Sequence, residues 1–115
     1  MLIRVNKAVA MRCGLNAAVV ADYLWKSFAE DEPMIREGKH WIRRSKLMMS
    51  LELSFFTEEM IKGALNRLIK DRVIQKGNFN ESCFDRTLWY TFTPFGRKLM
   101  ETLQCAGGNE KKENL

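Results

Sequence analysis

The sequence predicts a mostly helical α+β fold, and three observations point to it. Two amphipathic helical segments, residues 45–51 and 57–71, are separated by about six residues, a common connection between packed helices. Residues 73–76 and 87–93 follow, and their β-branched and aromatic side chains favour a β-hairpin. A helix-turn-helix followed by a hairpin is a winged helix-turn-helix, with a small β-sheet that includes the wing hairpin.

The N-terminal part of the chain is predicted to contain one long helix. Residues 2–5 alternate between apolar and polar side chains, as in a short strand, and residues 8–13 are compatible with either a helix or a loop. From Leu15, with Asn16 as the expected N-cap, apolar residues recur at helical spacing until the acidic residues before Pro33.

A hairpin and a short helix are expected next. Residues 34–36 and 40–43 flank a glycine turn and are predicted to be paired strands. Ser45 is the expected N-cap of the short helix that follows. The apolar face of this helix is predicted to consist of Leu47, Met48 and Leu51.

Residues 57–71 form the strongest predicted helix, with Thr57 as its N-cap. Apolar side chains recur every three or four residues and predict a buried stripe of Met60, Ile61, Ala64, Leu65, Leu68 and Ile69. The opposite side is polar and presents Glu58, Glu59, Lys62, Asn66 and Lys70, with Arg67 nearby.

The last part of the chain is predicted to form the wing and a final helix. The strands 73–76 and 87–93 are connected by a polar loop, residues 77–86. Pro94 suits the first position of a helix, whose apolar stripe would be Phe95, Leu99 and Leu103. We therefore expect one domain over residues 1–104 and a flexible tail over residues 105–115.

Composition argues against several functional classes. The 115 residues suffice for one hydrophobic core but not for a separate catalytic lobe, and the formal net charge of +5 favours a polyanionic partner. Cys13, Cys83 and Cys105 are irregularly spaced, which predicts neither a disulfide framework nor a zinc site. No apolar run resembles a membrane span or a signal peptide. We expect a cytoplasmic protein without a cofactor, a metal or a membrane partner.

Catalytic signals are weak. His40 is the only histidine and has no visible catalytic partner nearby, and Ser45 lacks the glycines of a nucleophile elbow. The aromatic residues of the predicted strands are expected in the core rather than as a base-stacking platform: Trp41, Trp89, Tyr90 and Phe92. The sequence therefore predicts a non-enzymatic protein.

Four segments resemble the winged-helix domains at the front of phage replisome organiser and DnaD-like replication initiator proteins. They are residues 14–20 (GLNAAVV), 38–45 (GKHWIRRS), 64–74 (ALNRLIKDRVI) and 85–91 (DRTLWYT), in the same order along the chain. The resemblance covers roughly residues 14–95. It implies a DNA-associated role in replication or its control on prophages and other mobile elements, with no catalytic residues to transfer.

Three groups of residues are candidate contacts to double-stranded DNA. Lys62, Asn66 and Lys70 recur every four residues, so the lysines would meet phosphates while Asn66 reaches a base edge; Arg67 lies beside them. The second group is the basic cluster Lys39, Arg43, Arg44 and Lys46, which would anchor the DNA backbone. The third is in the wing and comprises Lys76, Asn78, Asn80 and Arg86.

A second hypothesis remains open: the same fold would join a replication or regulatory protein assembly without contacting bases. Met60 and Gly63 occupy positions where many relatives place a threonine and a basic residue, and Glu58 and Glu59 would repel a phosphate at the start of the helix. A homodimer through the first and last helices is also expected, because the last apolar stripe needs a cover.

Overall fold

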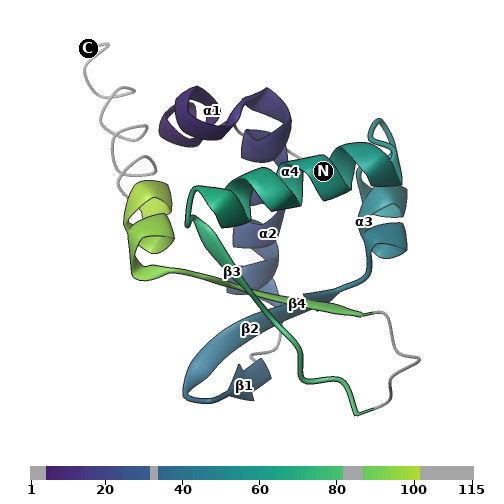
Figure 1. Cartoon of the computed structure of the whole chain (residues 1–115), viewed down its shortest axis with the longest axis vertical. Helices are drawn as coiled ribbons and strands as arrows, with labels where there is room; N and C mark the ends of the chain where they lie inside the picture. The colour runs from purple at the N-terminus through teal and green to yellow at the C-terminus, as the bar shows by residue number, and fades with distance from the viewer. Residues whose placement is uncertain (1–4, 32–33, 82–86, 102–115) are drawn as a thin grey trace.

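The computed structural model describes residues 5–31, 34–81 and 87–101, which form an α+β fold with a small antiparallel sheet (Figure 1). In chain order the elements are α1 (Lys7–Cys13), α2 (Leu15–Glu30), β1 (Met34–Arg36), β2 (Lys39–Arg44), α3 (Lys46–Glu52), α4 (Glu58–Lys70), β3 (Ile74–Gly77), β4 (Leu88–Phe92) and a helix over residues 94–101. The strand proposed for residues 2–5 and the tail 105–115 lie outside the described residues, apart from residue 5, which is not in a strand.

Both predicted strand pairs are confirmed. β1 pairs with β2 across a turn in which Glu37 and Gly38 have positive φ angles of 53° and 74°. β3 pairs with β4, and β2 also pairs with β4, which joins the pairs into one sheet of order β1-β2-β4-β3. The helices gather on one side of this sheet, with α3 and the 94–101 helix near opposite ends of α4 (Figure 1). None of the described helices is long and apolar enough to cross a membrane.

Side-chain caps fix where the helices begin. The Ser45 hydroxyl accepts from the amide of Met48, and the Thr57 hydroxyl accepts from the amide of Met60, so both predicted caps are confirmed. The expected cap at Asn16 is wrong, because α2 already begins at Leu15. The preceding residue, Gly14, has a φ of 96°, and this conformation separates α2 from α1.

The core contains the predicted stripe of α4. Ile61, Ala64, Leu65 and Leu68 are buried, while Met60 and Ile69 are partly buried against the same cluster. The aromatic residues of the strands are buried as expected, and they lie in two layers. Tyr90 and Phe92 belong to the main core. Trp41 and Trp89 instead pack with Phe79, at centroid distances of 4.9 and 5.4 Å.

One predicted apolar face is exposed, and another is only partly buried. In α3 the buried side chain is Met49, followed by buried Leu53, and the three residues of the predicted apolar face, Leu47, Met48 and Leu51, are all exposed. In the 94–101 helix Phe95 is 40% exposed, with the Arg12 guanidinium 5.0 Å from its ring centroid. Met100 and partly Leu99 pack inward within the same chain, and Leu103 lies outside the described residues.

Candidate nucleic-acid interface

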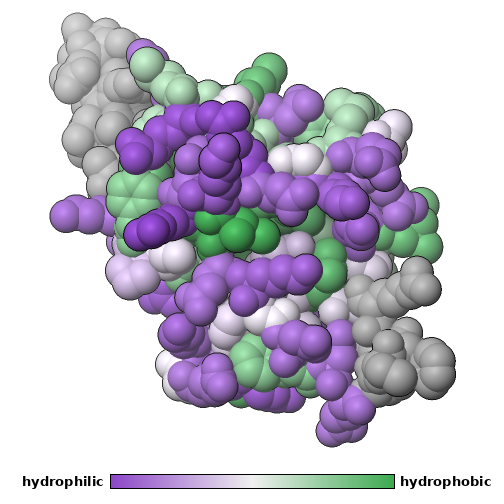
Figure 2. All heavy atoms as spheres, in the orientation of Figure 1, coloured by the Kyte–Doolittle hydropathy of each residue, from purple (hydrophilic) through white to green (hydrophobic). Residues whose placement is uncertain are grey.

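The outward face of α4 presents the first predicted group to solvent. Lys62, Asn66 and Lys70 are exposed, since the stripe on the other side of the helix is buried against the core. Within the described part of the chain, neither Lys62 nor Lys70 forms an ion pair. Figure 2 shows hydrophilic side chains over α4 and over the sheet below it, with a hydrophobic patch between them.

Arg67 has a structural role that the sequence did not indicate. Its Nε donates to Asp71 Oδ2 at 3.1 Å, and its Nη2 donates to the carbonyl oxygen of Arg12 at 2.9 Å. The same carboxylate oxygen of Asp71 accepts a hydrogen bond from the Cys13 thiol at 3.1 Å. These contacts tie the end of α4 to α1, which gives Arg67 a structural role in place of the predicted DNA contact.

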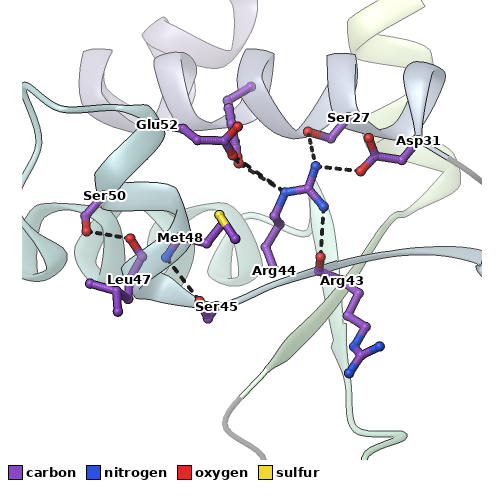
Figure 3. A network of polar contacts seen from close by, with 10 residues as sticks. Ser27, Asp31, Arg43, Arg44, Ser45, Leu47, Met48, Ser50 and Glu52 are labelled. Carbon is purple, nitrogen blue, oxygen red and sulfur yellow. Dashed lines mark hydrogen bonds and ion pairs between the residues drawn. The ribbon is translucent and has the colours of Figure 1, made fainter.

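The basic cluster at residues 39–46 is divided between the two faces of the sheet. Successive side chains of a strand point to opposite faces, and Figure 3 shows the side chains of Arg43 and Arg44 pointing apart. Arg43 is exposed, with its guanidinium 5.6 Å from the centroid of Trp89. Lys39 is exposed and Lys46 partly so, and both therefore stay in the candidate interface together with Arg43.

Arg44 points inward and belongs to a polar network (Figure 3). Its guanidinium contacts Asp31 at 2.5 Å and Ser27 at 3.4 Å, and lies 3.8 Å from Glu52. Its Nε donates to the hydroxyl of Tyr23 at 3.1 Å. The expected phosphate contact is therefore replaced by a structural role, because binding DNA through Arg44 would leave these groups without their cation.

Tyr23 completes this network by donating to Glu52. Burial, and next the hydrogen bond to Glu52, raises the pKa of Tyr23 to about 12. The hydroxyl therefore keeps its proton at neutral pH and acts as donor to Glu52 while it accepts from Arg44.

The predicted wing group is only partly described. Lys76 and Asn78 are exposed, whereas Arg86 lies outside the described residues. Asn80, predicted as a wing contact, is instead bonded within the hairpin: its side chain donates to the carbonyl oxygen of Thr87 at 2.8 Å and accepts from Trp89 Nε1 at 2.7 Å.

Sequence reasoning missed a second arginine at the outer face of the sheet. The Arg36 guanidinium lies 5.5 Å from the ring centroid of Trp89, the same ring that Arg43 approaches. Both arginines line a depression of about 370 Å³ beside Phe79 and Asn80. Arg43 is the direct cross-strand partner of Trp89, whereas Arg36 is on β1, which β2 separates from β4, so no pattern of neighbouring strands in the sequence could have identified it.

Comparisons of the chain with protein-family models, with characterised proteins and with solved structures find no match. Among the described residues, no three His, Cys, Asp or Glu side chains lie close enough together to form a metal site.

Proposed function

We propose that this chain is a non-enzymatic winged-helix protein that binds double-stranded DNA, of the kind found on prophages and other mobile elements. In this proposal α3 and α4 are the helix-turn-helix, α4 is the recognition helix, and the β3–β4 hairpin is the wing. The resemblance of the four sequence segments described above implies a role in replication or its control, and transcriptional control is the other role that we propose for DNA binding.

The observation that supports the proposal best is the solvent-exposed row Lys62, Asn66 and Lys70 on α4. The two lysine positions are about 12 Å apart along the helix axis, with Asn66 midway. The major groove admits one α-helix, in which an asparagine can pair with an adenine edge while lysines meet the flanking phosphates. Lys39, Arg43, Lys46, Lys76 and Asn78 would add contacts to the backbone.

Charge limits where DNA can lie on α4. Glu58 and Glu59 are exposed in its first turn, where carboxylates interact favourably with the helix dipole but repel phosphate. We therefore expect the groove contact to begin at Lys62 and to continue toward the end of α4.

NMR titration of the full chain with a duplex of arbitrary sequence at low salt tests this placement. The proposal predicts amide shifts at Lys62, Asn66, Lys70 and the described wing residues, and small shifts at the exposed side of α3. A titration in which duplex DNA moves no resonance of α4 would contradict it.

One observation favours the alternative of a protein-interaction module. Leu47, Met48 and Leu51 of α3 and Phe55 of the following turn are all exposed, and contiguous exposed apolar patches often mark protein contacts. Under this alternative, a protein partner would shift α3 resonances in the absence of nucleic acid.

A further inference from the structure

A groove lies where the end of α4 meets β3 and the start of the 94–101 helix. It has a volume of about 640 Å³, and its walls contain the apolar groups of Ile69, Ile74, Pro94 and Phe95. A hydrophobic patch is visible between α4 and the sheet in Figure 2. We call this depression the α4–β3 groove. Because its apolar walls come from three separate elements, it is suited to hold the side chains of a partner.

The groove runs along a free edge of the sheet. β3 is an edge strand of the described sheet, and Ile74, Gln75 and Lys76 all line the groove although successive side chains alternate between the two faces. The amide of Thr93 donates to the carbonyl oxygen of Val73 at 3.2 Å, and bonded and non-bonded pairs alternate along antiparallel strands. In this register the backbone amides and carbonyls of Ile74 and Lys76 point away from β4. The edge therefore offers these groups to an added strand.

Cations border the groove. Arg72 and Lys76 belong to its lining and are exposed, and within the described part of the chain neither forms an ion pair. The guanidinium of Arg12 lies 5.0 Å from the ring centroid of Phe95, which is one of the walls. Since Arg72 and Lys76 flank Ile74 along the chain, carboxylates at both ends of a short apolar segment would meet them.

The acidic residues of the neighbouring elements do not cancel this charge. None of the described acidic residues is in the lining of the groove. Asp71 precedes Arg72, but its carboxylate accepts hydrogen bonds from Arg67 and Cys13 on the side of α1. Glu101 is at the far end of the 94–101 helix from the groove.

We infer that the α4–β3 groove binds an extended segment of a partner protein, which adds as a strand beside β3. Apolar side chains of the segment fill the groove, and its carboxylates pair with Arg72 and Lys76. A nucleic-acid backbone would satisfy these cations but leave the apolar walls uncovered. Lys76 is also a proposed DNA contact, so the inference is tested without DNA and does not depend on DNA binding.

The probe is a capped octapeptide with four central valines and two glutamates at each end. NMR titration of the full chain at low salt should give saturable shifts at Ile69, Ile74, Lys76 and Phe95. Replacing the valines by serine should weaken binding about tenfold or more, since the apolar burial is lost. Equal binding of the serine peptide would overturn the inference, because the groove would then recognise charge alone, as for a nucleic acid. A valine peptide that moves none of these resonances would also overturn it.

N-methylation of the peptide tests whether it adds as a strand. Alternate amides of an added strand point toward β3, so methylating one pair of alternate valines should abolish binding. Methylating the other pair should leave the affinity close to that of the parent peptide. Equal affinities of the two methylated peptides would contradict strand addition.

Arg72→Asn/Lys76→Gln tests the role of the cations. Both positions are exposed, and asparagine tolerates the φ of 61° at Arg72. This variant should bind the valine peptide about fivefold more weakly, because two ion pairs are lost. Lys39→Gln/Lys62→Gln removes the same charge from exposed positions outside the lining and is the matched control. Equal affinities of the two double variants would refute recognition of the carboxylates by the groove.

Phe95→Ser tests the apolar wall, and Phe55→Ser is its control. Both side chains are exposed, at 40% and 58%, but only Phe95 lines the groove. Phe95→Ser should weaken binding of the valine peptide about fivefold, whereas Phe55→Ser should leave the affinity unchanged. An unchanged affinity for Phe95→Ser would show that the peptide binds elsewhere and would overturn the inference.

Discussion

The Nε of Arg44 donates a hydrogen bond to the hydroxyl of Tyr23 at 3.1 Å, and the same hydroxyl donates to Glu52. Through these contacts the end of β2 is joined to the middle of α2 and to the end of α3. The position of α3 relative to α2 therefore depends on one guanidinium group whose side chain is only 22% exposed.

Replacing Arg44 by methionine is expected to lower the free energy of unfolding by about 2 kcal/mol, because hydrogen bonds to charged groups are lost and Glu52 and Asp31 lose their cation. Arg43→Met is the matched control, as it removes the same charge from the adjacent, outward position. Arg43→Met should lower the free energy of unfolding by less than about 1 kcal/mol. Urea denaturation followed by circular dichroism measures both, and equal losses would argue against the structural role of Arg44.

Substitution by alanine is expected to have opposite effects on stability at two glycines. A Cβ at Gly96 would lie 1.9 Å from the carbonyl oxygen of Val73, whereas nothing lies within 4 Å of a Cβ at Gly63. Gly96→Ala should therefore destabilise the fold by about 1–3 kcal/mol, since the 94–101 helix must move away from Val73. Gly63→Ala should raise the melting temperature, because alanine stabilises a helix interior by about 0.5–1 kcal/mol relative to glycine.

The contact between Cys13 and Asp71 predicts a dependence of stability on pH. Burial, followed by the hydrogen bond to Asp71, raises the pKa of Cys13 from its usual value of 9.0 to about 12. The folded thiol therefore stays neutral where the unfolded thiol ionises. The neutral thiol of Cys13 therefore stabilises the fold fully below pH 9, and this stabilisation is lost as the pH rises from 9 toward 12.

Cys13→Ala isolates this effect, since the other two cysteines are common to both proteins. The difference in unfolding free energy between wild type and variant should be constant from pH 7 to 8 and should fall by about 1 kcal/mol by pH 10. Urea unfolding at each pH measures the difference. A difference that does not change up to pH 10 would mean that the thiol ionises equally in the folded and unfolded states.

Helix α4 could be predicted from the sequence because its thirteen residues repeat the apolar spacing several times. The seven residues of α3 span only two turns, so Leu47, Met48 and Leu51 defined one possible face and the fold buries Met49 instead. Short helices have too few positions for periodicity to identify the buried side, and the packing of α4 and α2 decides it.

The candidate site was predicted less well than the fold, because the register of β2 decides which of its two arginines points outward. Arg43 and Arg44 are chemically identical neighbours in a strand, and a shift of one residue in register exchanges the outward and inward positions. The pairing of Arg43 with Trp89 and of Arg44 with Leu88 places Arg44 beside α2. Sequence spacing contains no information on that choice. The exposure of Lys62, Asn66 and Lys70, by contrast, followed directly from the buried stripe of α4.

The salt dependence of duplex binding tests the central proposal most directly. The measurement is the association constant for a fluorescently labelled duplex at several salt concentrations. The logarithm of this constant falls as the logarithm of the salt concentration rises, and the slope should be shallower by about 2 for Lys62→Gln/Lys70→Gln than for wild type, because each lysine releases about one counterion. Lys7→Gln/Lys98→Gln removes the same charge from exposed positions on α1 and the 94–101 helix and should leave the slope close to that of wild type. Equal slopes for the two double variants, or wild-type binding that does not weaken as salt rises, would contradict DNA binding through α4.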